Sequence, residues 1–394
     1  MLEKRITTII IRNIEYTALM RKIGLQLRFQ DGYDMAVAQG VIEYGRTKEN
    51  WRIMGQGPLF SETLSDCDGL IARIESEEEA RHYASLGMPV VDIANSASHG
   101  LLDMVSNDDH QTGRLAGSYF KELGSGRVGW CGVKGVRWAS QRLQGFSQGM
   151  QMPLERIATF TRSLGWWRQL YEPAEELDQW LDSLERPIAL FCCNDLSAMK
   201  TELACQRLGI KIPEEVMVLG VDNETLLCEL ASPSISSIQP DCRAIGYSAA
   251  ALLDELLTNR TRPVQSRRVP PLPIIERESS RYVFCDDEHV ARALRMIRAE
   301  ATDGLTAAEV AQAAHIGRRS LEMRFKRERG RTILEEIQEY RLREAERLLI
   351  HTTLAVKEIV QLCGFASEHR FFSLFRSSHA MTPLSFRAAH TQLL

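Results

Sequence analysis

Two different hydrophobic patterns divide the chain. Up to about residue 280, short apolar runs alternate with amphipathic stretches, and the runs lie at 6–11, 51–54, 69–74, 90–93, 128–131, 188–192 and 216–221. Helical patterns between them include 35–44, 112–123, 142–151 and 196–208, and Gly209 follows the last one, as is common after a helix C-terminus. This alternation is typical of βαβ units around a parallel sheet. We therefore predict an α/β domain over residues 1–280.

A purely helical pattern follows. Val290, Leu294 and Ile297 have the i, i+4, i+7 spacing of one helix face, and no strand-like alternation follows as far as residue 394. A proline-rich basic stretch at 264–273 and a polar stretch at 276–287 precede this change. We place a linker at 281–286 and an all-α domain at 287–394.

The helical domain contains an internal repeat with an offset of 49 to 50 residues. Glu309, Val310, Gln312 and Ile316 of the first copy return as Glu358, Ile359, Gln361 and Phe365 in the second. A long helix expected at 333–350 joins the copies. Two copies of one small helical unit are therefore predicted.

Each copy has the pattern of a helix-turn-helix unit. In the first, Thr306 and Glu309 form a capping box, 315–317 is the turn, and a second helix at 318–329 buries Leu321 and Phe325. In the second, 363–365 is the turn and Ser367 caps the next helix. The residues expected to face DNA are Arg318, Arg319, Ser320, Glu322, Met323 and Lys326 in the first unit and Glu368, His369, Arg370, Ser373 and Arg376 in the second. Arg319 is suited to pair with a guanine.

Composition and charge add little to this picture. The apolar fraction is 44%, the charged fraction 25% and the formal net charge −4, which is ordinary for a soluble globular protein. The basic cluster between 318 and 331 fits phosphate contact and a solvated helix face equally well when taken alone. The run at 6–11 is too short for a signal peptide or a membrane span. The nine cysteines contain no CxxC pair, so we expect a reducing cytoplasm without disulfides or a zinc site.

The second repeat carries a longer motif. The segments 358–365 (EIVQLCGF), 372–376 (FSLFR) and 382–387 (TPLSFR) resemble the signature of AraC-type transcriptional activators, and the resemblance spans about residues 287–389. It implies operator DNA and RNA polymerase as partners, with two recognition helices in successive major-groove turns roughly 34 Å apart. His379 and Ala380 depart from the family's pattern, and Glu322 and Glu368 are acidic at readout positions, which implies an unusual operator sequence.

The α/β domain resembles the periplasmic-binding-protein-like sensors of LacI/GalR-type regulators. The resemblance lies in 105–116 (VSNDDHQTGRLA), 142–146 (RLQGF), 193–195 (CND) and 218–223 (VLGVDN). The usual N-terminal DNA-binding helices of that family are not found, and the AraC-type unit takes their place, a combination that resembles the xylose-operon activators as a group. This implies a homodimer in which the two lobes of each subunit close on a small sugar, a pentose such as xylose. Closure would change operator affinity or polymerase contact.

The resemblance also implies which residues bind the sugar. Tyr33 and Asp34 fall on the contact loop of the first lobe, and Arg142 on the arginine that binds hydroxyl groups. Asn194 and Asp222 fall at later strand ends, Gln239 falls near a crossover, and Trp138 or Trp166 is expected to cover the sugar ring. Structural roles also fit: Asp222 and Asp195 as caps, Arg142 as the partner of an acid between the lobes, and either tryptophan as packing.

Two other function classes fit the sequence less well. A solute receptor that serves a transporter does not explain the helical domain. A sugar-converting enzyme requires catalytic carboxylates or a cofactor loop, and the α/β domain shows no nucleophile elbow, Walker loop or metal-ligand cluster. We therefore expect a transcription regulator that has no catalytic residues, binds no metal or cofactor and does not associate with a membrane.

Overall fold

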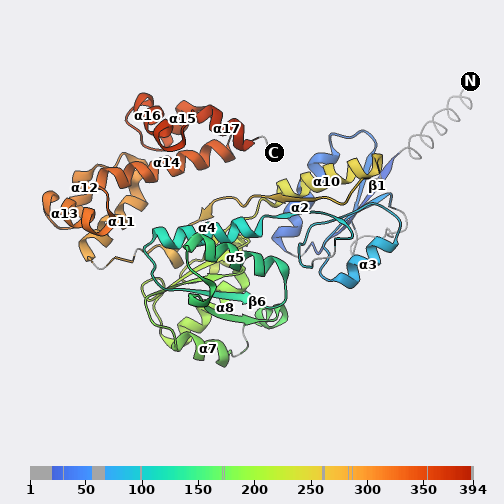
Figure 1. Ribbon diagram of the computed structural model, residues 1–394, viewed down its shortest axis with the longest axis horizontal. Coiled ribbons are helices and arrows are strands. Elements are labelled where there is room, and N and C mark those ends of the chain that lie inside the picture. The colour runs from blue at the N-terminus through green and yellow to red at the C-terminus, as the bar shows by residue number, and fades with distance from the viewer. Residues whose placement is uncertain are drawn as a thin grey trace, which may run out of the picture.

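The α/β region folds into two lobes, and each lobe is built on one six-stranded sheet (Figure 1). The computed structural model describes residues 20–29, 31–55, 67–97, 100–170, 172, 174–259, 262–282, 284–285, 287–352 and 354–391. The strand expected at 6–11 lies outside these residues. The expected fold class is confirmed, because a two-lobed α/β domain precedes an all-α domain with two helix-turn-helix units.

The first lobe has the strand order β11-β5-β4-β3-β1-β2, and every neighbouring pair is parallel. The strands are β1 (Arg21–Gln26), β2 (Trp51–Gly55), β3 (Gly69–Ala72), β4 (Val90–Asp92), β5 (Asp103–Asn107) and β11 (Ser266–Val269). Helices α2 (Gly32–Gly45) and α10 (Cys242–Thr258) pack on one face, where Val41 and Ile245 meet Ile71. Helix α3 (Glu77–Ser85) covers the other face with Tyr83 against Leu70.

The second lobe has the order β12-β10-β9-β8-β6-β7, and only β12 is antiparallel to its neighbour. Its strands are β6 (Val128–Val133), β7 (Ala158–Arg162), β8 (Ile188–Cys192), β9 (Val216–Val221), β10 (Ser236–Ile238) and β12 (Ile274–Ile275). Its helices are α4 (Asp109–Glu122), α5 (Arg137–Met150), α6 (Leu164–Arg168), α7 (Glu175–Asp182), α8 (Asp195–Leu208) and α9 (Thr225–Leu230). Trp130, Phe146 and Phe191 fill its core.

The chain passes between the lobes three times. The crossings run from β5 to α4, from β10 to α10, and from β11 to β12. Each sheet therefore combines segments that are distant in the sequence, and the lobes are joined side by side by the three crossings. Such a connection permits hinge motion of one lobe against the other.

The apolar runs did not reveal β1, β5, β7, β10, β11 or β12. Their polar residues have specific partners that the sequence does not show. Asp103 in β5 accepts a hydrogen bond from Arg262 over 2.8 Å. Ser237 in β10 donates one to Asp195 over 2.7 Å. Buried polar residues with such partners are compatible with a sheet interior, whereas an apolar pattern search passes over them.

Helices α4 and α5 are in direct backbone contact. A Cβ atom added to Gly113 would lie 1.9 Å from the backbone oxygen of Arg142, and one added to Gly145 would lie 1.9 Å from that of His110. Only glycine fits at these two positions. The close approach places the first turn of α4 beside Arg142 on α5.

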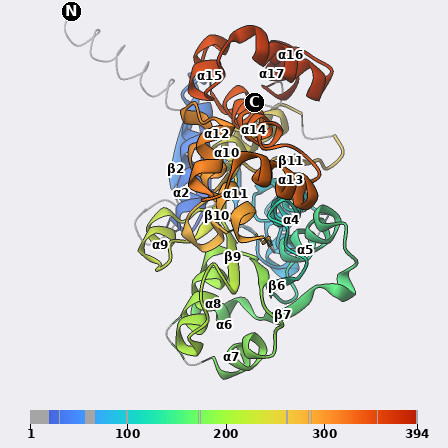
Figure 2. The ribbon, with the colours of Figure 1, turned by 90° about the vertical axis from the view of Figure 1, so that its left-hand side faces the viewer.

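The helical domain begins at α11 (Glu288–Glu300), whose Val290, Leu294 and Ile297 are buried as expected. The helices of the first unit are α12 (Ala307–Ala313) and α13 (Arg318–Arg329), and those of the second are α15 (Val356–Leu362) and α16 (Glu368–His379). Helix α14 (Ile333–His351) joins the units, and α17 (Pro383–Thr391) follows the second. Figure 2 shows the first unit beside α4 of the second lobe.

The buried carboxyl group of Glu202 in α8 generates a stability prediction. Its side chain is 1% exposed, and neither carboxyl oxygen has a hydrogen-bond partner among the described residues. Burial, with a smaller contribution from Glu278, raises the pKa of Glu202 to about 9. The folded protein therefore keeps this proton at neutral pH while the unfolded chain loses it, so stability falls as the pH rises from about 4.5 to about 9.

We predict that Glu202→Gln removes this pH dependence and makes the protein more stable than wild type at pH 7, by about 3 kcal/mol. Urea unfolding at pH 6 and pH 8, followed by far-ultraviolet circular dichroism, measures the effect. Glu214→Gln, at an exposed position in the same lobe, is the control and should follow wild type. Equal pH slopes for wild type and Glu202→Gln would contradict the prediction.

Candidate functional sites: the interlobe cavity and the recognition helices

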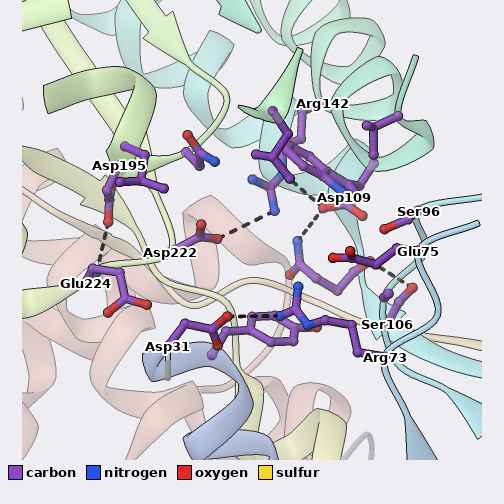
Figure 3. A pocket seen from close by; sticks show the side chains of 18 of the residues that line it. Asp31, Arg73, Glu75, Ser96, Ser106, Asp109, Arg142, Asp195, Asp222 and Glu224 are labelled. Carbon is purple, nitrogen blue, oxygen red and sulfur yellow. Dashed lines mark hydrogen bonds and ion pairs between the residues drawn. The ribbon is translucent and has the colours of Figure 1, made fainter. Parts of the chain in front are cut away.

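A cavity of about 300 Å³ lies between the lobes, where the carboxyl ends of both sets of parallel strands face each other (Figure 3). This volume and position are typical of small-molecule sites in α/β proteins. The lining is rich in ionisable groups, with Asp31, Glu75, Asp109, Asp195, Asp222 and Glu224 as acids and Arg73, Arg142 and Arg168 as bases. Both lobes contribute, so the cavity changes shape whenever the lobes move.

Arg142 lies at the centre of the second-lobe wall. It is buried, and its Nε donates to Oδ1 of Asp109, the first residue of α4, over 3.0 Å. Its Nη1 donates to the backbone oxygen of Cys193, and its Nη2 lies 3.9 Å from Oδ1 of Asp222. The guanidinium carbon is also 4.9 Å from the ring centre of Trp138. These contacts fix Arg142 before any ligand arrives.

Asp109 connects Arg142 to two buried asparagines. Its Oδ1 accepts from Nδ2 of Asn107 over 3.0 Å, and its Oδ2 accepts from Nδ2 of Asn95 over 2.8 Å. Because the amide nitrogen of Asn107 is used by the carboxylate, its oxygen Oδ1 points elsewhere, and it is buried without a partner among the described residues. An unpaired buried carbonyl costs about 1–3 kcal/mol. A hydroxyl donor on a ligand would satisfy it.

Asp222 and Asp195 differ in what they offer a ligand. Both oxygens of Asp195 are occupied, since Oδ1 accepts from Ser237 over 2.7 Å and Oδ2 accepts from the backbone nitrogen of Glu224 over 2.9 Å. Asp222 directly follows β9 with a φ of +109°, a strained value for a residue with a side chain. Burial raises the pKa of Asp222 to about 8, although Arg142 opposes that change. Burial also raises the pKa of Asp195 to about 6, so two cavity carboxyl groups titrate near neutral pH, and Asp222 is the one with the higher pKa.

On the first-lobe side, Tyr33 and Arg73 form the wall. The Tyr33 hydroxyl donates to the backbone oxygen of Ile93 over 3.1 Å, and the Arg73 guanidinium lies 4.9 Å from the Tyr33 ring centre. Asp34 is fully buried behind them and accepts from Nε of Arg73 over 2.9 Å. Asp34 also accepts from the backbone nitrogen of Arg28 over 2.6 Å, so it positions Arg73 and does not itself line the cavity.

The structure brings most of the expected ligand residues together. Tyr33, Trp138, Arg142, Asn194 and Asp222 line the cavity. Asn194 also caps α8 through its Oδ1, which accepts from the backbone nitrogen of Ser197 over 2.9 Å, so its amide nitrogen remains for a ligand.

Two other expected residues lie elsewhere. Gln239 is not part of the lining, and its Oε1 accepts from Asn223 over 3.3 Å. Trp166 is packed against Phe160 and Trp167, with ring-centre separations of 5.6 and 4.9 Å, and does not line the cavity either.

Sequence reasoning missed Asp31, Arg73, Glu75, Asn107 and Asp109 as cavity residues. Asn107 and Asp109 stand at the junction of β5 and α4, inside the segment that carried the sensor resemblance. That junction was the available signal, because the ends of parallel strands gather ligand residues. Arg73 and Glu75 also follow a parallel strand, β3, but the apolar run predicted at 69–74 placed Arg73 inside the strand, whereas β3 ends at Ala72.

Helix α13 has the exposure pattern of a recognition helix. Leu321 and Phe325 are buried, as predicted, and Arg318, Arg319, Met323 and Lys326 are exposed, Met323 by 64%. Ser320 is half-buried. Glu322 is half-buried as well, and its Oε2 accepts from the backbone nitrogen of Ile333 over 3.4 Å, so it faces the start of α14 more than the solvent.

Helix α16 presents a less basic surface. Glu368, His369, Arg370, Ser373 and Arg376 are all exposed, while Phe371 and Phe375 are buried. Ser367 caps the helix as expected, since its hydroxyl accepts from the backbone nitrogen of Arg370 over 3.3 Å. The helix ends at His379, whose Nε2 lies 2.8 Å from Oε1 of Glu346 on α14.

The basic cluster of the first unit is partly neutralised within the protein. Arg324 and Arg327 pair with Asp287, at 2.8 and 3.6 Å. Arg329 and Arg331 pair with Glu336, at 3.3 and 3.2 Å. Within the described ranges, the basic side chains of this cluster that have no ion-pair partner are Arg318, Arg319 and Lys326. The charge available to DNA is therefore concentrated on the N-terminal half of α13.

A ligand-sized cavity between two lobes, joined to two helix-turn-helix units, defines a ligand-responsive transcription regulator. A periplasmic binding protein-like domain is matched at residues 118–280 and a helix-turn-helix domain at 310–389. The chain is 31% identical over 386 residues to the xylose operon regulatory protein of Escherichia coli (strain K12), which covers 95% of this chain and 98% of that protein. The corresponding protein of Haemophilus influenzae is 27% identical over 378 residues, 93% of this chain and 98% of its own. The chain belongs to the family of xylose operon regulatory proteins.

Solved structures agree with this assignment. A xylose-binding transcription activator is 30% identical, with a TM-score of 0.58 over 94% of this chain and 99% of that one. A LacI family regulator from Enterococcus faecium, solved with bound ribose, has a TM-score of 0.53 at 20% identity over 66% of this chain and 98% of its own, which shows the shared sensor fold. Of the helices that the structure describes, none combines the length and apolarity needed to cross a membrane.

The exposure of α13 generates a prediction about DNA readout. Replacing Arg319 by Ala should weaken binding to the cognate operator by about 1–3 kcal/mol and relax the preference at one base pair, as expected for a side chain that contacts a base edge. Arg327→Ala is the matched control, because Arg327 lies on the same helix and pairs with Asp287 and Glu328. Fluorescence anisotropy with operator variants measures both effects. Equal losses for the two variants would remove Arg319 from the readout set.

Proposed function

We propose that this protein is a cytoplasmic transcription activator that binds operator DNA through its two helix-turn-helix units and responds to a small neutral sugar between its lobes. The buried Oδ1 of Asn107 carries the proposal, because Asn107 lines the cavity and this oxygen has no hydrogen-bond partner among the described residues, so a ligand hydroxyl group would supply the donor it lacks. Carboxylates in the same lining accept hydrogen bonds from sugar hydroxyl groups, and Trp138 supplies an apolar face for a sugar ring. The free thiols of all nine cysteines fit a reducing compartment.

The charge of the cavity selects a neutral sugar over an acid or a phosphate. Arg73 is paired with Asp34 over 2.8 Å, and Arg142 is paired with Asp109 over 3.0 Å. The remaining carboxyl groups outnumber the remaining arginine, Arg168, so an anionic ligand would meet like charge. Hydroxyl groups, which donate to carboxylates, suit this lining. Relatives named for the xylose operon support a pentose such as xylose.

Exposed leucines support a homodimer. Leu226 and Leu230 on α9 are 75% and 74% exposed, and Met35 on the neighbouring α2 is 48% exposed. The two helices adjoin, since Oε1 of Glu224 accepts from the backbone nitrogen of Gly32 over 2.9 Å. Apolar surface of this kind at the junction of both lobes fits a second copy of the chain. A dimer would present four helix-turn-helix units to a long operator and leave other faces for RNA polymerase.

Calorimetric titration with a panel of sugars tests the proposal. We expect micromolar binding of xylose, weaker binding of arabinose and ribose, and no binding of xylonate or xylose 5-phosphate. Operator affinity, measured with and without saturating sugar, should differ for the wild-type protein. No detectable binding of any sugar in the panel, or tighter binding of the acidic sugars than of the neutral ones, would contradict the proposal.

The raised pKa of Asp222 adds a pH prediction. The free protein keeps a proton on Asp222 below about pH 8, and sugar hydroxyls that donate to the carboxylate favour its charged form. Binding should therefore release a proton, and xylose affinity should rise several-fold, at most about tenfold per pH unit, between about pH 6.5 and pH 8 and then level off. Calorimetry in two buffers with different ionisation enthalpies measures both quantities. Asp222→Asn is the control, with no pH dependence, and an affinity that falls with pH would contradict the assignment.

A further inference from the structure

The helical domain rests on the C-terminal end of α4. The carboxylate of Glu122, the last residue of α4, accepts a hydrogen bond from Nη1 of Arg343 on α14. The backbone oxygen of Glu122 accepts from Nη2 of Arg329 at the end of α13, over 3.1 Å. Residues more than two hundred positions apart in the sequence therefore join the sensor to the first helix-turn-helix unit.

A second group of contacts lies beside the first. Glu276, directly after β12, accepts from Nη1 of Arg298 on α11 over 3.2 Å. The same Oε2 accepts from the hydroxyl group of Tyr119 on α4 over 3.0 Å, and that hydroxyl is 2.7 Å from Oγ of Ser280. The guanidinium of Arg298 also lies 5.8 Å from the Tyr119 ring centre. We call Tyr119, Glu122, Glu276, Arg298 and Arg343 the α4 latch.

The latch is tightly packed. The void enclosed by Glu122, Arg298, Tyr340 and their neighbours measures about 10 Å³, which is about the space of one water molecule. The side chain of Arg298 is only 13% exposed in its pair with Glu276. Charged groups buried in pairs hold a defined geometry, because separating them leaves a charge without a partner. The Glu122–Arg343 pair is more open, with side chains 41% and 36% exposed, so the Arg298–Glu276 pair and the hydrogen bond of Arg329 to the Glu122 backbone contribute most to holding the first unit against the second lobe.

The opposite end of α4 belongs to the ligand cavity. Its first residue, Asp109, holds Arg142 and Asn107 in place. The 14 residues of α4 separate this carboxylate from Glu122 by about 20 Å of rigid helix. The glycine contacts with α5 leave no space for α4 to slide or turn alone, since a Cβ at Gly117 would already lie 2.5 Å from the backbone oxygen of Phe146. Helix α4 consequently moves together with the second lobe.

Docking on the latch does not cover the readout residues. Arg329 is the last residue of α13, whereas Arg318 and Arg319 stand at its first turn and are exposed. The hydrogen bonds that Arg298, Arg329 and Arg343 of the helical domain donate to Glu276 and Glu122 all reach the second lobe. The domain can therefore bind DNA while it is docked, and its position follows the second lobe.

We propose that the α4 latch transmits ligand binding to DNA: it makes the first helix-turn-helix unit a rigid extension of the second lobe, so that lobe closure around a sugar repositions the recognition helices. This inference rests on the proposed function, since it requires a ligand that closes the lobes. It assigns a role in regulation to residues that touch neither the ligand nor DNA.

Reversing the charge at the latch tests the inference. Glu122→Arg places a cation against Arg329 and Arg343 and should release the domain. Xylose affinity should stay within twofold of wild type, and operator affinity without sugar should change by less than threefold. The ratio of operator affinities with and without xylose should fall at least fivefold towards one. Calorimetry measures the sugar affinity, fluorescence anisotropy measures the operator affinity, and small-angle X-ray scattering should show a larger radius of gyration.

Matched variants complete the test. Adding Arg343→Glu to Glu122→Arg restores an ion pair with reversed charges and should restore the coupling ratio. Arg343→Gln removes the pair without adding a charge and should lower the ratio even if Glu122→Arg does not fold. Lys121→Glu, at the exposed neighbouring position, should behave as wild type.

A wild-type ratio in Arg343→Gln and in the folded Glu122→Arg variant would overturn the inference while the proposed function stands. Wild-type protein that binds sugar without any change in operator affinity would contradict both.

Discussion

The buried ion pair between Arg142 and Asp109 is the interaction on which the rest of the cavity depends. Its two side chains are 7% and 3% exposed, so each charge would be costly without the other. Trp138 stacks on the guanidinium, and Asn95 and Asn107 hydrogen-bond to the carboxylate, so this one pair orients an aromatic group of the second lobe and two amide groups of the first lobe. The ligand therefore meets groups that are already in place, which lowers the entropic cost of binding.

The pair in turn depends on how closely α4 and α5 approach. Arg142 stands on α5 and Asp109 begins α4, and their distance is set by the glycines that allow the two backbones to touch. A larger residue at Gly113 would push the helices apart and lengthen the ion pair. The same contact makes α4 a stiff element between the cavity and the helical domain. Binding geometry and mechanical coupling thus arise from one helix pair.

The sequence predicted the positions of helices better than it predicted which side chains contact each other. Helix α13 was located residue for residue, because the turn at 315–317 before it and the buried spacing of Leu321 and Phe325 depend only on local order. The resemblance placed Asp34 beside Tyr33 on the contact loop, yet Asp34 lies behind Arg73 in the first turn of α2, because a position in a loop does not say which of two adjacent side chains faces the cavity. The pairing of Glu122 with Arg343 spans 221 residues and follows from the packing of whole domains. Local periodicity carries no information about such a contact.

The division of charge within α13 shows why a small movement of the sensor has a large effect on DNA recognition. The C-terminal end of this helix is held by Arg329, which bonds both to Glu336 and to the backbone oxygen of Glu122, while Arg319 at the other end remains free for a base. The 12-residue helix is about 18 Å long. A tilt of about 10° at the docked end therefore displaces the readout end by about 3 Å, more than the distance range of a hydrogen bond tolerates. Few basic side chains without an ion-pair partner remain on this helix, so little nonspecific attraction to DNA compensates for a misplaced Arg319. Recognition therefore depends on the angle that the second lobe sets.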